Sequence, residues 1–347
     1  TTLPINLLYL LYYEYRKNAK ESLNFSFFEY GKNSNGNPDD DRWEMYLELQ
    51  EMYAILQRWY NDKELYHYLG FLFFNFKAQT PFRDIYTQWK ALNSRDKFLK
   101  NIQHTIATRM LDRYLEETEK AAPDYQKCLK TMTEAISDFR ENWYNNDKEL
   151  YQILILLDIF RILDSKSIKK LPTDYFTRKS GQKDGEDKEH ILSQTPRKDN
   201  GEIATIKTDW ERFAQSEDFK DIRSQMQDIL NHSDAELTEQ ELIQLQNLLN
   251  SAGLNSIGNM ALLDLRINRS YGNADYTHKR TIIFQEYMNQ KYVRPHTLAV
   301  FMKGDIDARE ATGIPLNRWT LEDIKRNTDK IAKEIGKNFN AWLTQNN

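Results

Sequence analysis

Two short segments with the pattern of β-strands, in a chain otherwise patterned for helices, constrain the fold most. They are residues 189–194 and 257–265, and we predict that they pair as two strands of one small sheet. Helical spacing marks three stretches between them: 210–219, 224–230 and 238–250. The sequence therefore predicts a helical lobe inserted between the two strands.

The first 165 residues have helical patterns almost throughout, beginning with closely spaced leucines from Leu3. Four further helices are predicted in this region: 43–59, 96–117, 125–143 and 148–163. Residues 33–41 contain a glycine, a proline and three aspartates, and they are predicted to form a surface loop. Near the other end, residues 321–343 are predicted to form an amphipathic helix capped by Thr320.

From residue 165 to residue 187 the chain becomes polar, with lysines, glycines and aspartates clustered after Pro172. We place a domain boundary there, between an all-helical domain at residues 1–165 and a second domain at residues 166–347. A chain of 347 residues is long enough to build a core in each. The expected fold class is therefore mostly α, with the small sheet in the second domain.

Composition excludes several classes of protein. Hydrophobic residues make up 40% of the chain and aromatic residues 13%, which excludes a disordered chain. Cys128 is the only cysteine, so neither an intrachain disulfide nor a cysteine-ligated zinc site can form, and a reducing compartment is expected. The longest apolar run, residues 153–157, is far shorter than the roughly 20 residues that span a membrane. No signal-peptide pattern is present, so we expect a cytoplasmic protein with no membrane partner.

Four polar residues in and near the two predicted strands have the chemistry of a site that hydrolyses phosphodiesters. Such a site needs a base that activates water and oxygen ligands that hold a hard cation. Glu189 and His190 offer a carboxylate and an imidazole, and Asn259 and Asn268 offer amide oxygens. Neighbouring strand residues point to opposite faces of a sheet. We therefore predict a kink at the end of the strand that turns Glu189 and His190 to the same metal; the alternative is that Glu189 only orients His190.

The arrangement of these residues resembles a known family. The run Glu-His-Ile-Leu-x-Gln from Glu189, the run Ile-Gly-Asn-x-x-Leu-Leu around Asn259, a second Asn nine positions later and then Lys279 are similar to the C-terminal HNH (His-Me finger) domain of GmrSD-type restriction endonucleases. The same Asn-to-Asn spacing recurs in the HNH domains of RNA-guided CRISPR nucleases. Ser193 departs from the family, which often has proline there.

The resemblance implies a ββα-metal (HNH) nuclease domain with a helical insertion, and a role for each residue. His190 aligns with the general base, and Glu189 and Asn268 align with the ligands of one Mg²⁺ or Mn²⁺ ion. Asn259 aligns with the Asn that braces the loop carrying the catalytic His. Three basic residues are expected to contact DNA phosphates: Arg269, Lys279 and Arg280. They belong to a segment, residues 266–294, that has six basic and two acidic residues in a chain of net charge -4.

The resemblance also implies what surrounds this domain. The family usually carries an N-terminal nucleotide-binding half with an Asp-Gly-Gln-Gln-Arg signature, which this sequence lacks. The chain begins at Thr1, on an apolar helical pattern and without Met. We therefore expect it to be the C-terminal part of a longer protein, or to work with a partner subunit that supplies the nucleotide-binding half.

The expected function is that of a metal-dependent DNA endonuclease of a prokaryotic restriction or anti-phage system, with modified DNA among its expected substrates. Two alternatives remain open from the sequence. One is a non-catalytic module that binds nucleic acid or docks a partner. The other is an RNA nuclease, because nothing in the motif reads the 2′-hydroxyl.

Overall fold

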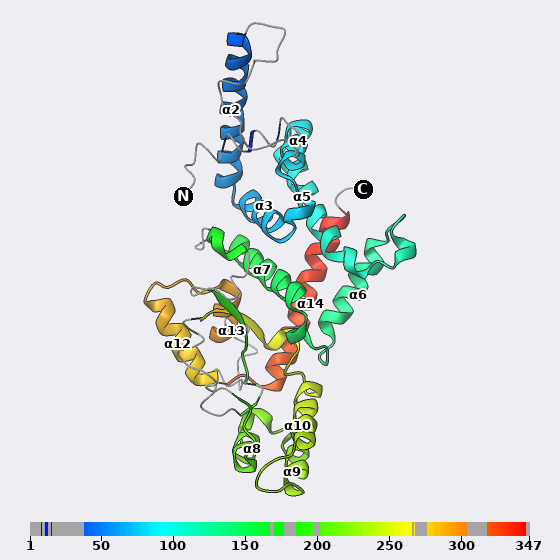
Figure 1. Ribbon diagram of the computed structural model, residues 1–347, viewed down its shortest axis with the longest axis vertical. Coiled ribbons are helices and arrows are strands. Elements are labelled where there is room, and N and C mark those ends of the chain that lie inside the picture. Colours follow the sequence, from blue (N-terminus) through cyan, green and yellow to red (C-terminus); the bar gives the residue numbers. More distant parts are fainter. Residues whose placement is uncertain are drawn as a thin grey trace.

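The computed structural model describes residues 8, 11, 12, 15, 38–166, 170–176, 185–193, 195–196, 202–265, 267, 276–303 and 318–344. The molecule is elongated, with α2 projecting at one end, the lobe of α8, α9 and α10 at the other, and a small sheet between them (Figure 1). The α-helices are α2 (Pro38–Asn61), α3 (Lys63–Asn75), α4 (Phe82–Leu92), α5 (Arg95–Leu111), α6 (Tyr125–Ser137), α7 (Asp147–Asp164), α8 (Lys207–Ala214), α9 (Arg223–Asn231), α10 (Glu239–Ser251), α12 (Tyr276–Met288), α13 (Pro295–Met302) and α14 (Leu321–Thr344). The strands are β1 (Glu186–His190) and β2 (Met260–Asp264), and short 3₁₀ helices include η4 (Trp143–Asn145), η5 (Thr173–Phe176) and η7 (Ile257–Asn259).

The predominantly helical character predicted from the sequence is confirmed. Several boundaries were wrong: α5 ends at Leu111 rather than at residue 117, and α6 ends at Ser137 rather than at residue 143. In addition, α2 begins at Pro38, so the last four residues of the loop predicted at 33–41 are helical, and the rest lie outside the described residues. Proline is well suited to the first position of a helix, and aspartates favour the positive end of the helix dipole. Helix α13 was not predicted at all. Within the described ranges, no helix combines the length and apolarity needed to cross a lipid bilayer.

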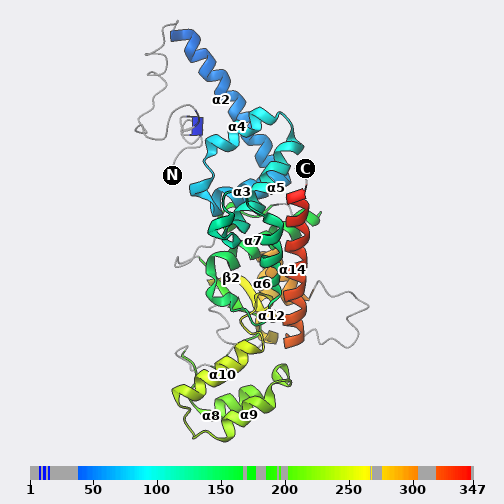
Figure 2. The ribbon, with the colours of Figure 1, turned by 90° about the vertical axis from the view of Figure 1, so that its right-hand side faces the viewer.

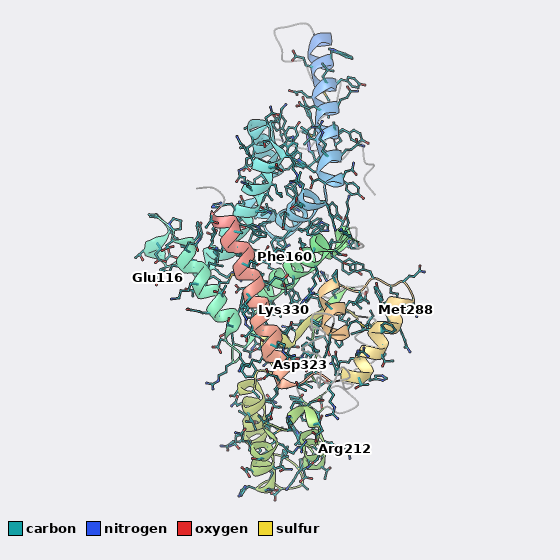
Figure 3. All side chains as sticks on the ribbon, turned by 180° about the vertical axis from the view of Figure 1, so that it is seen from behind. Glu116, Phe160, Arg212, Met288, Asp323 and Lys330 are labelled. Atoms are coloured by element: carbon teal, nitrogen blue, oxygen red, sulfur yellow. The ribbon has the colours of Figure 1, made fainter. Side chains whose placement is uncertain are left out.

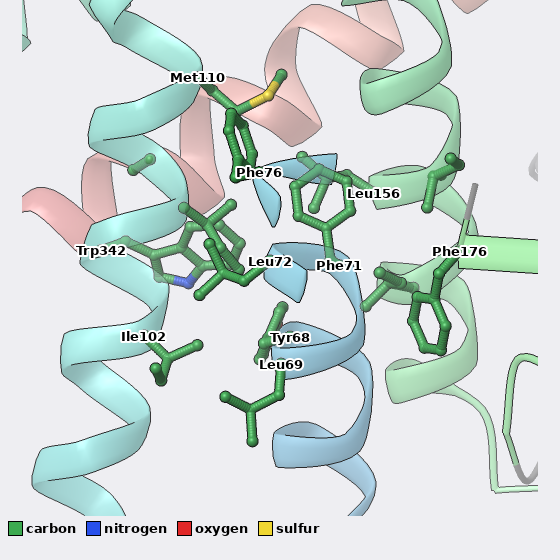
Figure 4. Close-up of a cluster of buried hydrophobic side chains, with 14 of the residues drawn as sticks. Tyr68, Leu69, Phe71, Leu72, Phe76, Ile102, Met110, Leu156, Phe176 and Trp342 are labelled. Atoms are coloured by element: carbon green, nitrogen blue, oxygen red, sulfur yellow. The ribbon is translucent and has the colours of Figure 1, made fainter. Parts of the chain in front are cut away.

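Helices α2 to α7, which we call the helical region, are held together by a large apolar core to which α14 also contributes. Side chains of α3, α5 and α7 meet there, and Trp342 of α14 inserts among them (Figure 4). Helix α14 runs along α5 and α6 (Figure 2). This helix begins as predicted: Thr320 and Asp323 cap it by reciprocal hydrogen bonds. The division at residue 165 stays a prediction, and across it the two regions share this core.

The two predicted strands pair in an antiparallel sheet, although the first was predicted too far along the chain and the second was predicted to begin three residues too early. β1 spans Glu186–His190 rather than 189–194, and residues 191 and 192 form a bend. β2 starts at Met260, because residues 257–259 form η7. The register pairs Glu186 with Asp264 and His190 with Met260.

β2 is buried on both faces and separates the two cores of the molecule. Met260 and Leu262 pack into the core of the helical region, and Ala261 and Leu263 pack into a second core. That second core also contains the apolar side chains of the inserted lobe, such as Trp210. The predicted lobe is confirmed as α8, α9 and α10, and Thr238 and Glu241 form the capping box that starts α10.

Helix α14 approaches the loop before β2 so closely that only glycine fits at position 258. A Cβ atom on Gly258 would lie 2.3 Å from the backbone oxygen of Ile324. The side-chain amide of Asn327 also donates to the backbone oxygen of Gly258 at 2.8 Å. The last helix therefore holds the start of β2 directly.

His67 of α3 is a buried histidine with a structural role. Its Nε2 accepts the backbone N–H of Leu171 at 3.0 Å, and its Nδ1 lies 2.5 Å from the backbone oxygen of Lys63. An Nε2 that accepts a hydrogen bond is unprotonated, so Nδ1 carries the proton and donates it. Burial lowers the pKa of His67 to about 4.

We predict that His67 makes the protein less stable as the pH falls from about 6.5 to about 4. The folded pKa lies below the unfolded value of about 6.5, so between these values the unfolded chain binds more protons. The contribution is complete above pH 6.5, and the shift corresponds to about 3 kcal/mol. Urea unfolding of wild type and His67→Leu at pH 7 and pH 4.5 measures it. His67→Leu should show the smaller pH dependence, and the exposed-residue control His232→Leu should match wild type. Equal pH dependence in all three proteins contradicts the assignment.

Candidate active site around strand β1

Asn259 holds the bend that follows His190. Its side-chain oxygen accepts the backbone N–H of Leu192 at 2.8 Å, and its amide nitrogen donates to the backbone oxygens of Leu192 and Leu254 at 3.0 and 2.9 Å. Its backbone oxygen accepts the N–H of Ile191 at 2.9 Å. The side chain is completely buried. These hydrogen bonds fasten the bend to η7, and the bracing role that the resemblance implies for Asn259 stays a prediction.

His190 ends β1 and faces the helical region. Its ring stacks on Tyr144 of η4, with the ring centroids 4.6 Å apart and the planes 21° from parallel. Its Nε2 lies 2.9 Å from Asn255 Oδ1, and the amide nitrogen of Asn255 donates to Asn250 Oδ1 at 2.7 Å. Only 8% of the surface of His190 is exposed. The imidazole is therefore fixed both in its plane and at one ring nitrogen.

The same Tyr144 ring also contacts the lysine two residues before His190. The ammonium of Lys188 lies 4.1 Å from the ring centroid, which is a cation–π contact, and it also bonds Asp147. Residues 188 and 190 share one face of the strand because side chains alternate along it. Tyr144 thus touches two of the side chains on this face of β1, those of Lys188 and His190.

Glu189 lies on the opposite face of β1, toward α12. Its Oε1 is 2.6 Å from the ammonium of Lys279, which also donates to the backbone oxygen of His190 at 2.7 Å. The strand register continues unbroken through His190, so the kink predicted at this point does not occur within β1. Strand alternation prevailed because the backbone of both residues pairs with β2.

A buried ion cluster fixes the start of β1. The guanidinium of Arg294 donates to both oxygens of Glu186, at 2.8 and 2.6 Å, and to Asp158 of α7 at 2.7 Å. It also donates to the backbone oxygen of Tyr175 in η5. All three charged side chains are buried. Burial raises the pKa of Asp158, and the charge of Arg294 acts in the opposite direction.

Of the remaining predicted site residues, two are described by the structure and two are not. Asn268 and Arg269 lie outside the described residues, so the metal-binding part of the predicted ββα unit is not described. Arg280 of α12 is half-buried and donates from Nε to the backbone oxygen of Phe301 at 3.0 Å. Lys279 is 1% exposed, and its ammonium points inward to Glu189 rather than to solvent.

The described part of the site fits a hard cation by the type of its donor. Within the described residues Oε1 of Glu189 accepts from Lys279, and Oε2 of the same carboxylate is an oxygen ligand of the kind that Mg²⁺ and Mn²⁺ prefer. Among the described residues, no three His, Cys, Asp or Glu side chains cluster as metal ligands do. The second predicted ligand, Asn268, is an amide outside this set.

Sequence reasoning missed three residues that shape the site: Tyr144, Asn255 and Arg294. Tyr144 lies before the predicted domain boundary, in a segment assigned to the helical domain. Arg294 was counted as part of a surface basic segment, although it is buried between carboxylates from two distant segments. Asn255 precedes the Ile-Gly-Asn run by only two residues, and that proximity was the one available signal.

Comparison with known proteins assigns the chain to a family. Residues 133–334 match the family of GmrSD restriction endonucleases, C-terminal domain, which confirms the resemblance seen in the sequence. The match covers more than half of the chain, including α7, both strands and the first part of α14. It begins within α6, before the predicted boundary at residue 165. No curated protein and no solved structure matches the chain.

We predict that Asn259→Ala lowers the free energy of unfolding by about 3 kcal/mol or more. It would leave the backbone N–H and oxygen of Leu192 and the oxygen of Leu254 without this partner, and an unsatisfied buried polar group costs roughly 1–3 kcal/mol. Chemical denaturation measures the loss. Asn340→Ala, at an exposed position of α14, is the matched control. A loss no larger than that of the control would show that Asn259 does not brace the bend.

Proposed function

The chain belongs to the family of GmrSD restriction endonucleases through their C-terminal domain, and we propose that it is a metal-dependent DNA endonuclease of a prokaryotic restriction or anti-phage system. Family membership supports hydrolysis of a phosphodiester bond. The observation that carries the proposal for this chain is the way His190 is held, by Asn255 at one nitrogen and by Tyr144 along its face. A fixed imidazole is what a general base requires.

The proposed reaction uses His190 as the base. Its imidazole accepts a proton from a water molecule, whose oxygen forms a bond to phosphorus as the bond from phosphorus to the 3′ oxygen breaks. The leaving oxygen ends as a 3′-hydroxyl after taking up a proton from solvent. General-base catalysis of this kind contributes roughly 10²- to 10⁴-fold.

The hydrogen bond to Asn255 indicates which nitrogen of His190 does this. The amide nitrogen of Asn255 donates to Asn250, which turns Oδ1 toward the imidazole. An amide oxygen is only an acceptor, so Nε2 of His190 carries the proton. In the neutral ring Nδ1 is then the basic nitrogen, and we propose that it receives the proton from water.

Glu189 and Asn268 are the residues proposed to hold one Mg²⁺ or Mn²⁺ ion. Bound there, the ion would supply neutralisation of charge on the phosphate oxygens. Lys279 adds positive charge on the same side of β1, 2.6 Å from the Glu189 carboxylate. Arg269 and Arg280 are proposed to contact DNA phosphates, as is Lys279 once its ammonium leaves Glu189.

The two faces of β1 favour a second candidate function, that of a non-catalytic module that binds nucleic acid or docks a partner. His190 and Glu189 point away from each other, and His190 is nearly covered. A domain that kept these residues only for their packing would have this arrangement. Cleavage assays separate the two functions.

We predict that His190→Ala and His190→Gln lower the rate of DNA nicking by about 10² or more, since both remove the base. The full-length protein is incubated with supercoiled plasmid and Mn²⁺, and a structured RNA is tested in parallel. His232→Ala, at an exposed histidine of the lobe region, is the control and should retain wild-type activity. Circular dichroism establishes that each variant is folded. Nicking by a folded His190 variant at close to the wild-type rate excludes His190 as the base, and no nicking by wild type favours the second candidate.

We predict that Asn255 acts through the imidazole, so that its replacement changes the pH dependence of the reaction. Asn255→Asp places a carboxylate 2.9 Å from His190 Nε2, which stabilises the imidazolium and moves the acidic limb of the rate profile to higher pH by about one unit or more. Asn255→Ala should lower kcat with little change in KM. An unshifted profile in a folded Asn255→Asp variant would mean that this hydrogen bond does not set the state of His190.

A further inference from the structure

A groove lies on the face of the molecule turned away from the view of Figure 1. It has a volume of about 1180 Å³ and runs between α3, α7, α13 and α14, near Phe160 and Lys330 (Figure 3). Leu298, Ala299 and Met302 of α13 line it. On its other side α13 faces the sheet, where Thr297 donates to the backbone oxygen of Leu262 at 2.7 Å. Helix α13 therefore separates this groove from β1 and β2.

Helix α14 contributes a row of positive charges to this face. Arg326, Lys330, Lys333 and Lys337 follow one another at intervals of four, three and four residues, so they share one face of the helix. Lys330, Lys333 and Lys337 line the groove, and Arg326 continues the row beyond it. The row covers about 16 Å, because each residue of an α-helix advances the chain by about 1.5 Å.

The groove contains more positive than negative side chains. Lys63 and Arg161 stand at its opposite wall, and the acidic lining residues are Glu64, Asp164 and Glu334. Arg95 already pairs with Glu64 at 2.5 Å. Lys333 and Lys337 are exposed, and within the described part of the chain neither forms an ion pair. A concave surface with an excess of positive charge raises the local concentration of a polyanion.

The positive charge of this row contrasts with the charge of the rest of the chain. The chain as a whole has a net charge of -4, and residues 202–251, which form the inserted lobe, have 11 acidic and 4 basic residues. The lobe would repel a polyanion, whereas the α14 row would attract one. The aromatic side chains in the groove wall, Tyr68, Phe160 and Trp342, are only 3–4% exposed. They cannot serve as platforms on which unpaired bases stack.

We propose that the α14 groove binds the phosphate backbone of double-stranded DNA, as a second contact separate from the reaction site around β1. A line of cations suits the regular phosphates of one strand, and the covered aromatic side chains favour a duplex over a single strand. Binding of this kind is independent of base sequence, because contacts to phosphates carry no sequence information. The two amide side chains in the lining do not change this: Gln103 is only 8% exposed, and the amide of Asn338 donates to the backbone oxygen of Glu334. The choice of DNA as the polyanion rests on the proposed function.

The experiment measures binding without cleavage. Fluorescence anisotropy follows a labelled 30-base-pair duplex of arbitrary sequence, titrated with the full-length protein in EDTA at several salt concentrations. The Lys333→Gln/Lys337→Gln variant should bind about tenfold or more weakly near 0.1 M salt. The slope of log affinity against log salt should become shallower by roughly two, since each lost phosphate contact removes about 0.9. The loss should be the same for a second duplex of unrelated sequence.

The control variant, Lys77→Gln/Lys130→Gln, removes the same charge at exposed positions outside the groove and should keep the wild-type slope. An unchanged slope in the groove variant, or an equal change in the control, overturns the proposal. Tighter binding of the single strand than of the duplex also overturns it, as does binding to vesicles containing phosphatidylserine without binding to duplex DNA. Cleavage plays no part in this assay, so a chain with no nuclease activity can still confirm the groove, and an active nuclease can fail it.

Discussion

The ion cluster of Asp158, Arg294 and Glu186 is the contact on which the arrangement of the molecule depends. It joins α7 of the helical region, the first residue of β1 and the start of α13, and all three of its charged side chains are buried. Removing one partner of such a cluster leaves an uncompensated buried charge, at a cost of about 3–5 kcal/mol. A lysine could not take the place of Arg294, because the guanidinium donates four hydrogen bonds here and an ammonium has only three N–H groups.

That cluster also explains why the site is divided between the two faces of β1. With Glu186 turned to Arg294, alternation along the strand directs Lys188 and His190 to the helical region and Glu189 to α12. The helical region thus supplies Tyr144 to the histidine, while α12 supplies Lys279 to the carboxylate. The site is a product of both regions, and this accords with a family match that begins within α6.

Much of the fold could be predicted from the sequence, because helical periodicity and capping residues are local signals. Thr238 and Thr320 marked helix starts correctly, and the apolar run of 257–265 located the second strand to within three residues. Asn259 could be singled out from the Ile-Gly-Asn run, and the structure places it beside the bend after His190. Contacts between distant segments could not be foreseen. In the sequence Arg294 looks like one more surface cation, because its partners Asp158 and Glu186 lie 136 and 108 positions earlier in the chain. Strand alternation alone would have put Glu189 and His190 on opposite faces, and the kink predicted to bring them together was wrong.

The close fit of Gly258 against α14 has a consequence for the order in which the protein matures. The loop that leads into β2 is closed by Ile324 and Asn327, which belong to the last helix described. Domains form as the chain leaves the ribosome, N-terminal parts first. The helical region can begin to fold early, yet the loop before β2, whose Asn259 bonds the bend after His190, stays without its final support until α14 emerges. A chain still being synthesised therefore lacks this support for the loop before β2 until α14 is made.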